Sequence, residues 1–410
     1  MQNTIVSFVD SSEHANFFSR LACASNEKII FITNSFSTYL ILKFKHENVR
    51  LLSCTNSSNR LENVDFKHTI DYVTNLVDEK KAYRLSNRLL NVLENISNEF
   101  NIEYMLLWNG CKIGDQVCSY YANQNDIECL FFEIANIPGK IFVDSMGTNK
   151  NSSIYHYPEI LDMPIDSETN KDYELWKANY LKQKFGAFVL PQSKKKSIIV
   201  SLGSNIVNYI ASLFNICETR SFFFLNNIKN LFENRILIPD DEPNLKNLNG
   251  YIFIPLQVHN DTQVLLNSSL GLYDLIDKGI EEAQKLSLSL VIKPHPAEKN
   301  KDILDYIKKK KESFKSIYIT KMNTFQLIEH SKYVITINST VGLEAMILGK
   351  NVNVLGDALY SNFNESRLKN YILRFLVNLE YFDNEKYKNK DFENILQQYR
   401  KYKKKVGVLK

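Results

Sequence analysis

The sequence predicts an α/β protein of two domains, each with a parallel β-sheet covered by helices on both faces. Short apolar runs of strand length alternate with segments whose apolar residues have helical spacing, and this alternation occurs in both halves of the chain. The strand candidates are apolar almost throughout, which is typical of parallel strands buried on both faces. In addition, 410 residues exceed what one ordinary hydrophobic core accommodates.

The first half of the chain is expected to form an N-terminal Rossmann-like domain over residues 1–160. Its predicted strands are Thr4–Val9, Lys28–Thr33, Val49–Cys54, Glu103–Trp108, Ile127–Phe132 and Lys140–Val143. Its predicted helices are Ala15–Ala24, Thr38–Lys45 and Ala82–Phe100.

Residues 161–197 have a different composition. They are polar and charged, with Pro164, Pro191 and the run Lys194–Lys196. We expect this segment to be an interdomain connection that is partly helical, because proline and polar residues separate periodic segments.

The second half repeats the α/β pattern over residues 198–370, which are expected to form a C-terminal Rossmann-like domain. Its predicted strands are Tyr251–Val258, Leu288–Ile292, Ser316–Thr320, Tyr333–Ile337 and Asn351–Leu355. Its predicted helices are Leu272–Leu286, Ile303–Phe314, Phe325–His330 and Val341–Leu348. Residues 371–410 are predicted to be a helical tail, which could cross back to the first domain.

Composition excludes several classes of protein. A formal net charge of +4 is small for this length and does not indicate nucleic-acid binding. No apolar run approaches the roughly 18 residues of a membrane span, and the first residues do not have the pattern of a signal peptide, so we expect a cytoplasmic protein. The six cysteines include no Cys-x-x-Cys pair, so reduced thiols are expected and a zinc site is not.

Asn338, Ser339 and Thr340 lie where the predicted strand Tyr333–Ile337 passes into the predicted helix Val341–Leu348. A strand, a small polar turn and a helix direct free backbone N–H groups and hydroxyls at an anion. N-capping of the helix is an equally plain explanation, and the two roles are compatible.

His295 follows a neighbouring predicted strand, between Pro294 and Pro296. An imidazole at the carboxyl end of a strand is suited to donate to a phosphate, and Lys293 on the same strand face could add positive charge. The alternative is a histidine that caps a rigid turn locally.

Two carboxylates in the C-terminal half need an explanation. Asp261 lies in a polar turn, four residues after Gln257, where the predicted strand Tyr251–Val258 ends. A turn explains it, but an aspartate at this edge could also act as base, nucleophile or electrostatic stabiliser. Glu344 lies in an otherwise apolar helix and therefore requires a partner, such as a ribose hydroxyl or a nearby N–H.

The N-terminal half offers two polar turns. Trp108 and Asn109 belong to a Trp-Asn-Gly turn, and Asn149 ends a polar turn after the strand Lys140–Val143. Glu133 directly follows an apolar strand and is expected at the carboxyl edge of its sheet. Loop structure explains these residues, and the alternative is a second carboxylate that faces a cleft.

These motifs together resemble the bacterial capsule-polysaccharide biosynthesis proteins, which include retaining β-Kdo transferases that use CMP-Kdo. The resemblance covers about residues 100 to 360 and rests on the ordered set Trp-Asn-Gly (108–110), Phe-Phe-Glu…Pro-Gly-Lys-Ile-Phe-Val-Asp-Ser-Met-Gly-Thr-Asn (131–149), Pro-Leu-Gln-Val-x-x-Asp (255–261), Lys-Pro-His-Pro (293–296) and Asn-Ser-Thr-Val-Gly-Leu-Glu-Ala-Met-x-x-Gly-Lys (338–350). It implies a GT-B-like pair of Rossmann-like domains with a cleft between them and with CMP held by the C-terminal domain.

The resemblance also implies roles for individual residues. His295, Ser339 and Thr340 would contact the phosphate or the sugar carboxylate of the donor, and Glu344 would face the cytidine ribose. Asp261 would be the catalytic nucleophile and Glu133 the acid/base residue. Two departures from the family pattern are Asn260 before Asp261, where glycine is common, and the short segment Asp357–Tyr360, where an aromatic-rich stretch is common.

The sequence therefore predicts a glycosyltransferase that moves β-Kdo from CMP-Kdo onto a capsule or O-antigen glycan with retention, without a metal or other cofactor. Its partners would be the nucleotide-sugar donor and a glycan acceptor, which could be lipid-linked. A sialyltransferase-like or other nucleotide-sugar transferase, and a non-catalytic glycan-assembly component, remain alternatives. The basic residues Arg400, Lys401, Lys403, Lys404 and Lys405 leave open whether the tail is docked on the protein or attracts an anionic inner membrane.

Overall fold

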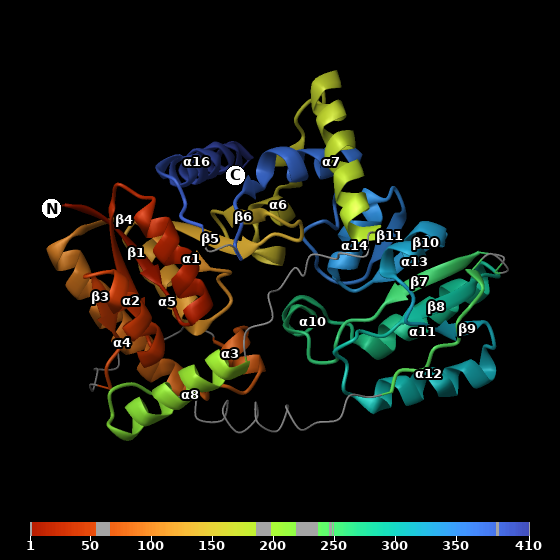
Figure 1. The fold of residues 1–410 in the computed structure, drawn as a ribbon, viewed down its shortest axis with the longest axis horizontal. Helices are drawn as coiled ribbons and strands as arrows, with labels where there is room; N and C mark the ends of the chain where they lie inside the picture. Colours follow the sequence, from red (N-terminus) through yellow and green to blue (C-terminus); the bar gives the residue numbers. More distant parts are fainter. Residues whose placement is uncertain are drawn as a thin grey trace. The chain divides into compact units, whose positions relative to one another are not determined.

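The computed structural model describes residues 2–54, 66–185, 198–218, 237–245, 248, 250–382 and 385–409, with the backbone alone for residues 198–202. The chain divides into two compact units (Figure 1). Unit 1 comprises Met1–Ile160, Gln192–Leu231 and Phe375–Lys410, and unit 2 comprises Leu161–Pro191 and Phe232–Arg374. Both units are α/β, as the sequence predicts.

The sheet of unit 1 has seven strands among the described residues, in the order β12-β6-β5-β4-β1-β2-β3. Their bounds are β1 Asn3–Phe8, β2 Lys28–Thr33, β3 Val49–Leu51, β4 Asn101–Trp108, β5 Glu128–Ile134, β6 Lys140–Asp144 and β12 Val377–Asn378. β1 to β5 are parallel, which confirms the predicted pairing for these strands.

The expectation of a wholly parallel sheet is wrong for β6, which runs antiparallel to β5, and β12 runs antiparallel to β6. The reason is the short connection between β5 and β6, which ends at Gly139 with a φ of +72°. A parallel crossover needs about a dozen residues or more, whereas a tight turn returns the chain antiparallel.

Helices cover both faces of this sheet. One face is covered by α1 (Ser12–Cys23), α2 (Phe36–Lys45) and α16 (Asn389–Leu409), and the other by α4 (Glu79–Glu99) and α5 (Ile113–Gln124). Helix α5 was not expected from the sequence. It packs so closely on β1 that a Cβ at Gly114 would collide with the ring of Phe8.

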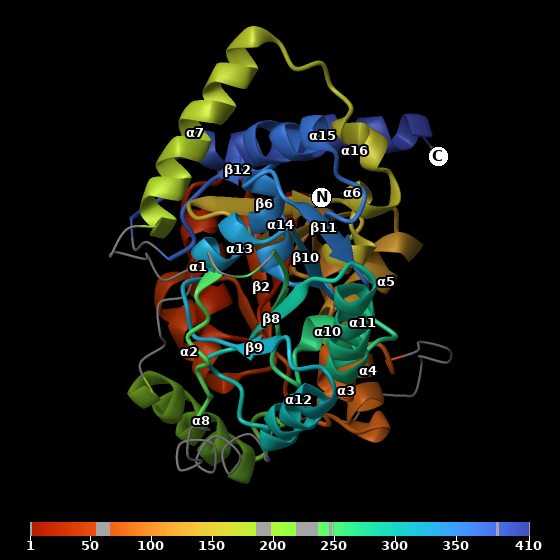
Figure 2. The ribbon, with the colours of Figure 1, turned by 90° about the vertical axis from the view of Figure 1, so that its right-hand side faces the viewer.

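The sheet of unit 2 is parallel throughout, with the order β11-β10-β7-β8-β9 among the described residues. Strands β8 to β11 are labelled in Figure 2, and β7 in Figure 1. Its strands are β7 Tyr251–Pro255, β8 Ser289–Lys293, β9 Ile317–Ile319, β10 Tyr333–Thr336 and β11 Asn351–Val354. Helices α11 (Leu272–Lys285) and α12 (Lys301–Ser313) pack on one face, and α13 (Thr324–His330) and α14 (Thr340–Ile347) on the other. The predicted strands and helices of this half are confirmed to within a few residues.

The unit boundaries differ from those expected. Helix α7 (Ser167–Phe185), in the predicted connection, belongs to unit 2, whereas α8 (Ile198–Leu213) belongs to unit 1, where Ser204 and Asn208 bond Ser37 on α2. The polar composition of α7 is that of a surface helix, with three buried residues: Thr169, Tyr173 and Tyr180. Residues 186–197 of the predicted connection lie outside the described residues.

The C-terminal helix α16 is docked on unit 1. Its apolar residues Phe392, Ile395 and Tyr399 are buried in the core beside α1. Arg400 donates to the Tyr104 hydroxyl at 2.7 Å, Lys403 pairs with Glu128, and Lys405 donates to a backbone carbonyl. The basic cluster is therefore largely used within the protein, as the docked alternative predicts. Within the described part of the chain, no helix combines the length and apolar character that crossing a membrane requires.

Candidate functional site

The topology of unit 2 defines one place where a ligand can bind. β7 comes first in this sheet, β8 and β9 follow on one side of it, and β10 and β11 follow on the other. The order of strands therefore reverses between β7 and β10, and in open α/β sheets ligands bind outside the carboxyl ends of the strands at such a switch point. The predicted residues after β7, β8 and β10 all lie at this edge.

Gln257 joins the two strands at the switch point. Its side-chain amide donates to Asn338 Oδ1 at 3.0 Å and to Asp261 Oδ2 at 3.2 Å. Asn338 in turn donates to the carbonyl of Gln263 at 2.8 Å. Because both ends of the Asn338 amide have partners, its side chain holds the two loops together.

Asp261 has two constraints. It is the N-cap of the short helix α10 (Thr262–Asn267), where Oδ1 accepts from the Gln263 N–H at 2.8 Å, while Oδ2 accepts from Gln257. Its side chain remains partly exposed. The carboxylate is thus fixed in orientation at the carboxyl end of β7 and accessible, which satisfies the geometric requirement for a nucleophile or base.

The turn after β10 caps α14, as expected. The Ser339 hydroxyl accepts from the Val341 N–H at 3.2 Å, and the Tyr360 hydroxyl donates to the Ser339 carbonyl. Thr340 is exposed at the first position of the helix. The first N–H groups of a helix have no intrahelical partner and carry the positive end of its dipole, so an anion can bind here.

His295 is exposed and follows β8. Its Nδ1 accepts from the Ala297 N–H at 3.1 Å. Neighbouring atoms partly desolvate the ring and thereby lower the pKa of His295, while Asp261 and Glu298 oppose the shift. The ring is therefore neutral at pH 7 with its proton on Nε2, which can donate a hydrogen bond to an anion.

Lys293 and Glu344, which the sequence also placed at the donor site, have partners elsewhere in unit 2. Lys293 donates to the Met322 carbonyl and to Thr324, at 2.7 and 2.8 Å. Glu344 is buried and pairs with Lys184 at 2.9 Å. The partner that a carboxylate in an apolar helix requires is thus a lysine of α7, a helix that the sequence suggested was a linker. Pro296 is exposed in the loop after His295.

The structure adds a pair that the sequence did not identify. Glu298 is 4% exposed and accepts from His259 Nδ1 and from the His259 N–H, both at 2.8 Å. It also accepts from the N–H groups of Lys299 and Asn300. Although burial opposes it, these hydrogen bonds hold the pKa of Glu298 below its ordinary value. The signal in the sequence that could have identified this pair is the carboxylate of Glu298, which comes two residues after the Pro-His-Pro turn.

In unit 1, the structure brings Glu133 and Asn149 together. Asn149 Nδ2 donates to Glu133 Oε2 at 3.1 Å, and both residues are partly buried. Burial raises the pKa of Glu133 to about 7, although hydrogen bonds from Thr148 and Asn149 oppose the shift. A carboxyl group with such a pKa can exchange a proton near neutral pH.

Trp108 and Asn109 serve the structure of unit 1 in ways that the sequence did not indicate. Trp108 is 8% exposed, stacks on His14 with ring centroids 4.4 Å apart, and packs against Phe17. Asn109 has a φ of +46° and its side chain accepts from the Cys111 N–H, which forms the turn after β4. The Asn109 carbonyl accepts from Thr148, beside Glu133 and Asn149.

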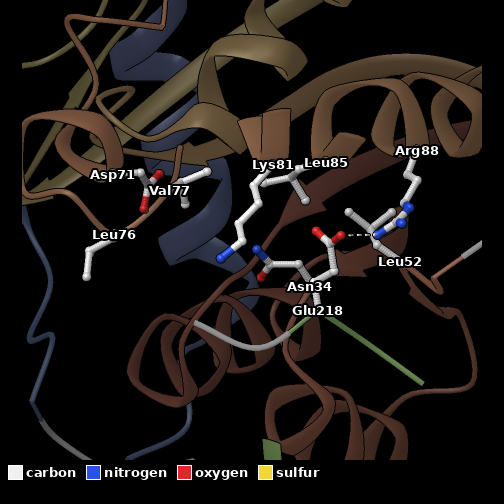
Figure 3. Close-up of a pocket in the computed structure, with 9 residues that line it drawn as sticks. All are labelled: Asn34, Leu52, Asp71, Leu76, Val77, Lys81, Leu85, Arg88 and Glu218. Atoms are coloured by element: carbon white, nitrogen blue, oxygen red, sulfur yellow. Dashed lines mark ion pairs between the residues drawn. The ribbon is translucent and has the colours of Figure 1, made fainter. Parts of the chain in front are cut away.

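A pocket in unit 1 lies apart from all of the predicted residues (Figure 3). Its lining includes Asn34 just after β2, Leu52 just after β3, and Lys81 and Arg88 of α4. Glu218 pairs there with Arg88 at 3.5 Å. Among the described residues, no group of His, Cys, Asp and Glu is arranged to hold a metal ion.

Residues 104–363 match the family described as capsule polysaccharide biosynthesis protein. This match covers more than half of the chain, so the chain belongs to that family. The matched residues include every predicted site residue in both units.

Two curated relatives match a shorter part of the chain. Protein FixF of Sinorhizobium fredii is 38% identical over 117 residues, and the capsule polysaccharide export protein KpsS of Escherichia coli is 34% identical over 120 residues. Each match covers 27% of this chain, and 28% and 31% of the respective relatives. The matched segment thus spans less than a third of either relative.

Solved structures were also similar at low identity. A β-Kdo 2,7 transferase of KpsC from Thermosulfurimonas dismutans matches 99% of this chain and 100% of its own, with 11% identity and a TM-score of 0.44. The β-Kdo 2,4 transferase of the same protein covers 75% of this chain and 95% of its own, with 13% identity and a TM-score of 0.36.

Proposed function

We propose that this chain is a glycosyltransferase that moves β-Kdo from CMP-Kdo onto a bacterial surface glycan with retention of configuration. The observation that carries the proposal is the edge of unit 2, where Asp261, His295 and the N-terminus of α14 lie at adjacent strand ends. Membership in the capsule polysaccharide family supports a sugar substrate. The Kdo donor itself rests on the resemblance of the sequence motifs.

The donor presents a phosphate and a sugar carboxylate, and both are anions. The Nε2–H of His295 and the first N–H groups of α14 would bind them, because fixed hydrogen-bond donors stabilise charge that develops on a leaving phosphate. CMP is already a good leaving group, so we propose that transfer needs no metal cofactor. Full activity in the presence of a chelator is the expected result, and loss of activity that Mg²⁺ or Mn²⁺ restores would contradict it.

Retention requires two displacements. In the first, an Asp261 oxygen attacks the anomeric carbon, the bond from that carbon to the phosphate oxygen breaks, and CMP leaves with the electron pair. In the second, the acceptor hydroxyl attacks the same carbon, its proton passes to a base, and the electron pair of the broken ester returns to Asp261. We propose Glu133 as that base, because its raised pKa suits proton transfer near neutral pH.

Substitution of Asp261 by Asn tests this mechanism. Asparagine also caps helices, so Asp261→Asn should keep the fold and CMP binding while abolishing transfer. Asp78→Asn is the matched control, because Asp78 caps α4 of unit 1 in the same way, by accepting from the Lys81 N–H at 2.8 Å.

Intact-protein mass spectrometry of the wild type, with CMP-Kdo and a slow acceptor, should show an added ulosonic acid on the peptide that contains Asp261. A product of inverted configuration, or an Asp261→Asn enzyme with most of its activity, would refute the mechanism. A panel that includes CMP-sialic acid and UDP-sugars identifies the donor, and the absence of any donor turnover would favour a non-catalytic assembly role.

A further inference from the structure

The His259–Glu298 pair, which lies beside the proposed donor site, has no role in the mechanism above. His259 lies in the loop after β7, two residues before Asp261, and Glu298 lies in the loop after His295. The side chain of His259 is 41% exposed, whereas that of Glu298 is 3% exposed. One member of the pair is thus buried and the other reaches the surface of the site.

The hydrogen bonds determine how the His259 ring is protonated. Glu298 accepts from four hydrogen atoms, those of the His259 N–H, the His259 ring and two N–H groups of its own loop. An ionised carboxylate has no proton to donate, so Nδ1 of His259 must carry the hydrogen in their 2.8 Å bond. In the neutral ring, Nε2 is then a bare nitrogen that can accept a proton.

This arrangement is the reverse of that at His295, whose Nδ1 accepts from Ala297 and whose Nε2 carries the proton. Two histidines at adjacent strand ends therefore present opposite groups, a hydrogen-bond donor at His295 and a proton acceptor at His259. The proton acceptor has a buried carboxylate behind it, which stabilises an imidazolium ring once a proton is bound.

Lys293, the basic residue that the sequence placed beside the donor phosphate, is bound instead to Met322 and Thr324. These two partners are neutral, so Lys293 keeps its charge near His295, but two of its N–H groups are already used. The neutral His295 ring and the dipole of α14 supply no full positive charge. The charged groups that act on His295 are Asp261, Glu298 and Lys293, and Glu298 also pairs with His259.

We propose that His259 is a second phosphate-binding residue, whose Nε2 takes up a proton from solvent when a nucleotide phosphate binds, with Glu298 balancing the resulting charge. The bound ring then donates Nδ1–H to Glu298 and Nε2–H to a phosphate oxygen. This inference rests on the proposed function for the identity of the nucleotide, but not for the phosphate itself.

Proton-linked calorimetry tests it. Binding of CMP, UDP and inorganic phosphate is measured at about pH 8 in two buffers of different ionisation enthalpy, because a phosphate monoester with a second pKa near 6 is then a dianion. Wild-type protein should take up protons on binding. His259→Gln should lose most of this uptake and bind roughly tenfold more weakly, and Glu298→Gln should reduce both.

The matched control is His330→Gln. The side chain of His330 is 46% exposed and its Nδ1 is bonded to the Gln326 carbonyl, so it also presents Nε2 to solvent, but it lies on α13 ahead of β10. This variant should show the wild-type uptake and affinity. Uptake that persists in His259→Gln, or failure of all three phosphate compounds to bind the wild type, would overturn the inference.

Two further results separate this inference from the proposed function. If UDP binds with a proton uptake that depends on His259 while CMP does not bind, the proposal of a CMP-activated donor is wrong but the inference about His259 stands. If the His259→Gln protein does not fold, the ring nitrogens of wild-type His259 still decide the matter by ¹⁵N NMR. Both nitrogens should be protonated in the phosphate complex, and an unprotonated Nε2 there would overturn the proposal.

Discussion

The two units place polar residues at equivalent positions of their sheets but use them differently. In unit 1 the order of strands also reverses, between β1 and β4. Asp10 follows β1 there and is bonded to Lys112 at 2.6 Å, and Trp108 at the end of β4 is stacked on His14. In unit 2 the corresponding edge carries Asp261 and His295 with accessible atoms.

The difference shows that sheet topology locates a possible ligand site. Whether polar atoms there can reach a ligand depends on whether neighbouring side chains already occupy them. At the reversal in unit 1, the side chain of Asp10 is 4% exposed and that of His14 is 14% exposed. Burial lowers the pKa of His14, although Asp10 opposes the shift. A ligand that came to this edge would have to break those internal contacts. Glu133, farther along the same sheet, is the group of unit 1 that suits chemistry at neutral pH.

Glu133→Gln should produce the largest change in unit 1, because a general base typically contributes about 10² to 10⁴ in rate. Wild-type turnover should rise with pH through about 7, as the base loses its proton, and the variant should lose this dependence. The matched control is Asp115→Asn, because Asp115 is also buried in unit 1 with a raised pKa but has no proposed role. A variant that keeps the wild-type rate and pH profile would remove Glu133 from the mechanism.

The same carboxyl group also affects stability, with a sign that can be checked. Its pKa is raised from 4.5 to about 7 in the folded protein, so the unfolded chain loses this proton first as pH rises. The contribution of this group to the free energy of unfolding therefore decreases as the pH rises from 4.5 to about 7, and it is constant above pH 7. Glu133→Gln should melt at a higher temperature than wild type above about pH 7 and should lose that advantage near pH 4.

His295→Ala should produce the next largest effect, roughly tenfold to a hundredfold weaker CMP binding, from the loss of one hydrogen bond to a charged group. The comparison variant in unit 1 is His14→Ala, which should destabilise the protein through lost packing on Trp108 but leave CMP affinity unchanged. Because His295 donates in its neutral form, its contribution should persist above pH 7. If the two variants weakened CMP binding equally, the conclusion that unit 2 and not unit 1 binds CMP at its strand ends would be wrong.

Much of this organisation was predictable from the sequence, and the residues show why. Nearly continuous apolar strands such as Tyr333–Ile337 and a polar turn such as Asn338–Thr340 have local causes, so they are recognised without tertiary information. The cap at Ser339 was confirmed for the same reason, and Gly349, with a φ of +75°, ends the same helix.

What the sequence could not provide depended on distant pairing. Glu344 is bonded to Lys184, which is 160 residues away, so no local pattern revealed its partner. The sequence placed Trp108 in a polar Trp-Asn-Gly turn, but its ring packs against His14 and Phe17 of α1. Helix α5 was missed because its interface depends on close contact between Gly114 and β1. The antiparallel direction of β6 is different, because it follows from the short connection between β5 and β6, which is a local feature of the sequence.

Lys184→Met tests whether Glu344 has a structural or a ligand-binding role. Both side chains are about one-tenth exposed, so removing the lysine leaves an uncompensated carboxylate and should destabilise the protein by about 3 kcal/mol. Lys285→Met is the control, because Lys285 is 71% exposed and its contact with Glu282 is 3.9 Å long, so the change should be under about 0.5 kcal/mol. If Lys184→Met has no effect on the denaturation midpoint but weakens CMP binding, the pair serves the ribose site instead.

The smallest effects should come from the basic end of α16. Arg400, Lys403 and Lys405 each contact another part of unit 1, although Arg400 and Lys403 remain exposed. Lys401 and Lys404 are exposed, and we expect each of these two residues to contribute about 1 kcal/mol of attraction to anionic lipid. Substituting both by Gln should change co-sedimentation with anionic vesicles by at most about thirtyfold at low salt and by almost nothing at physiological salt. Substituting Lys403 by Gln should instead lower the melting temperature, because it breaks the contact with Glu128. Vesicle binding that is strong, salt-sensitive and lost in the Lys401/Lys404 variant would show that the tail attaches to membranes despite its docking. Unit 1 would then have a binding surface on α16 in addition to the proposed base Glu133.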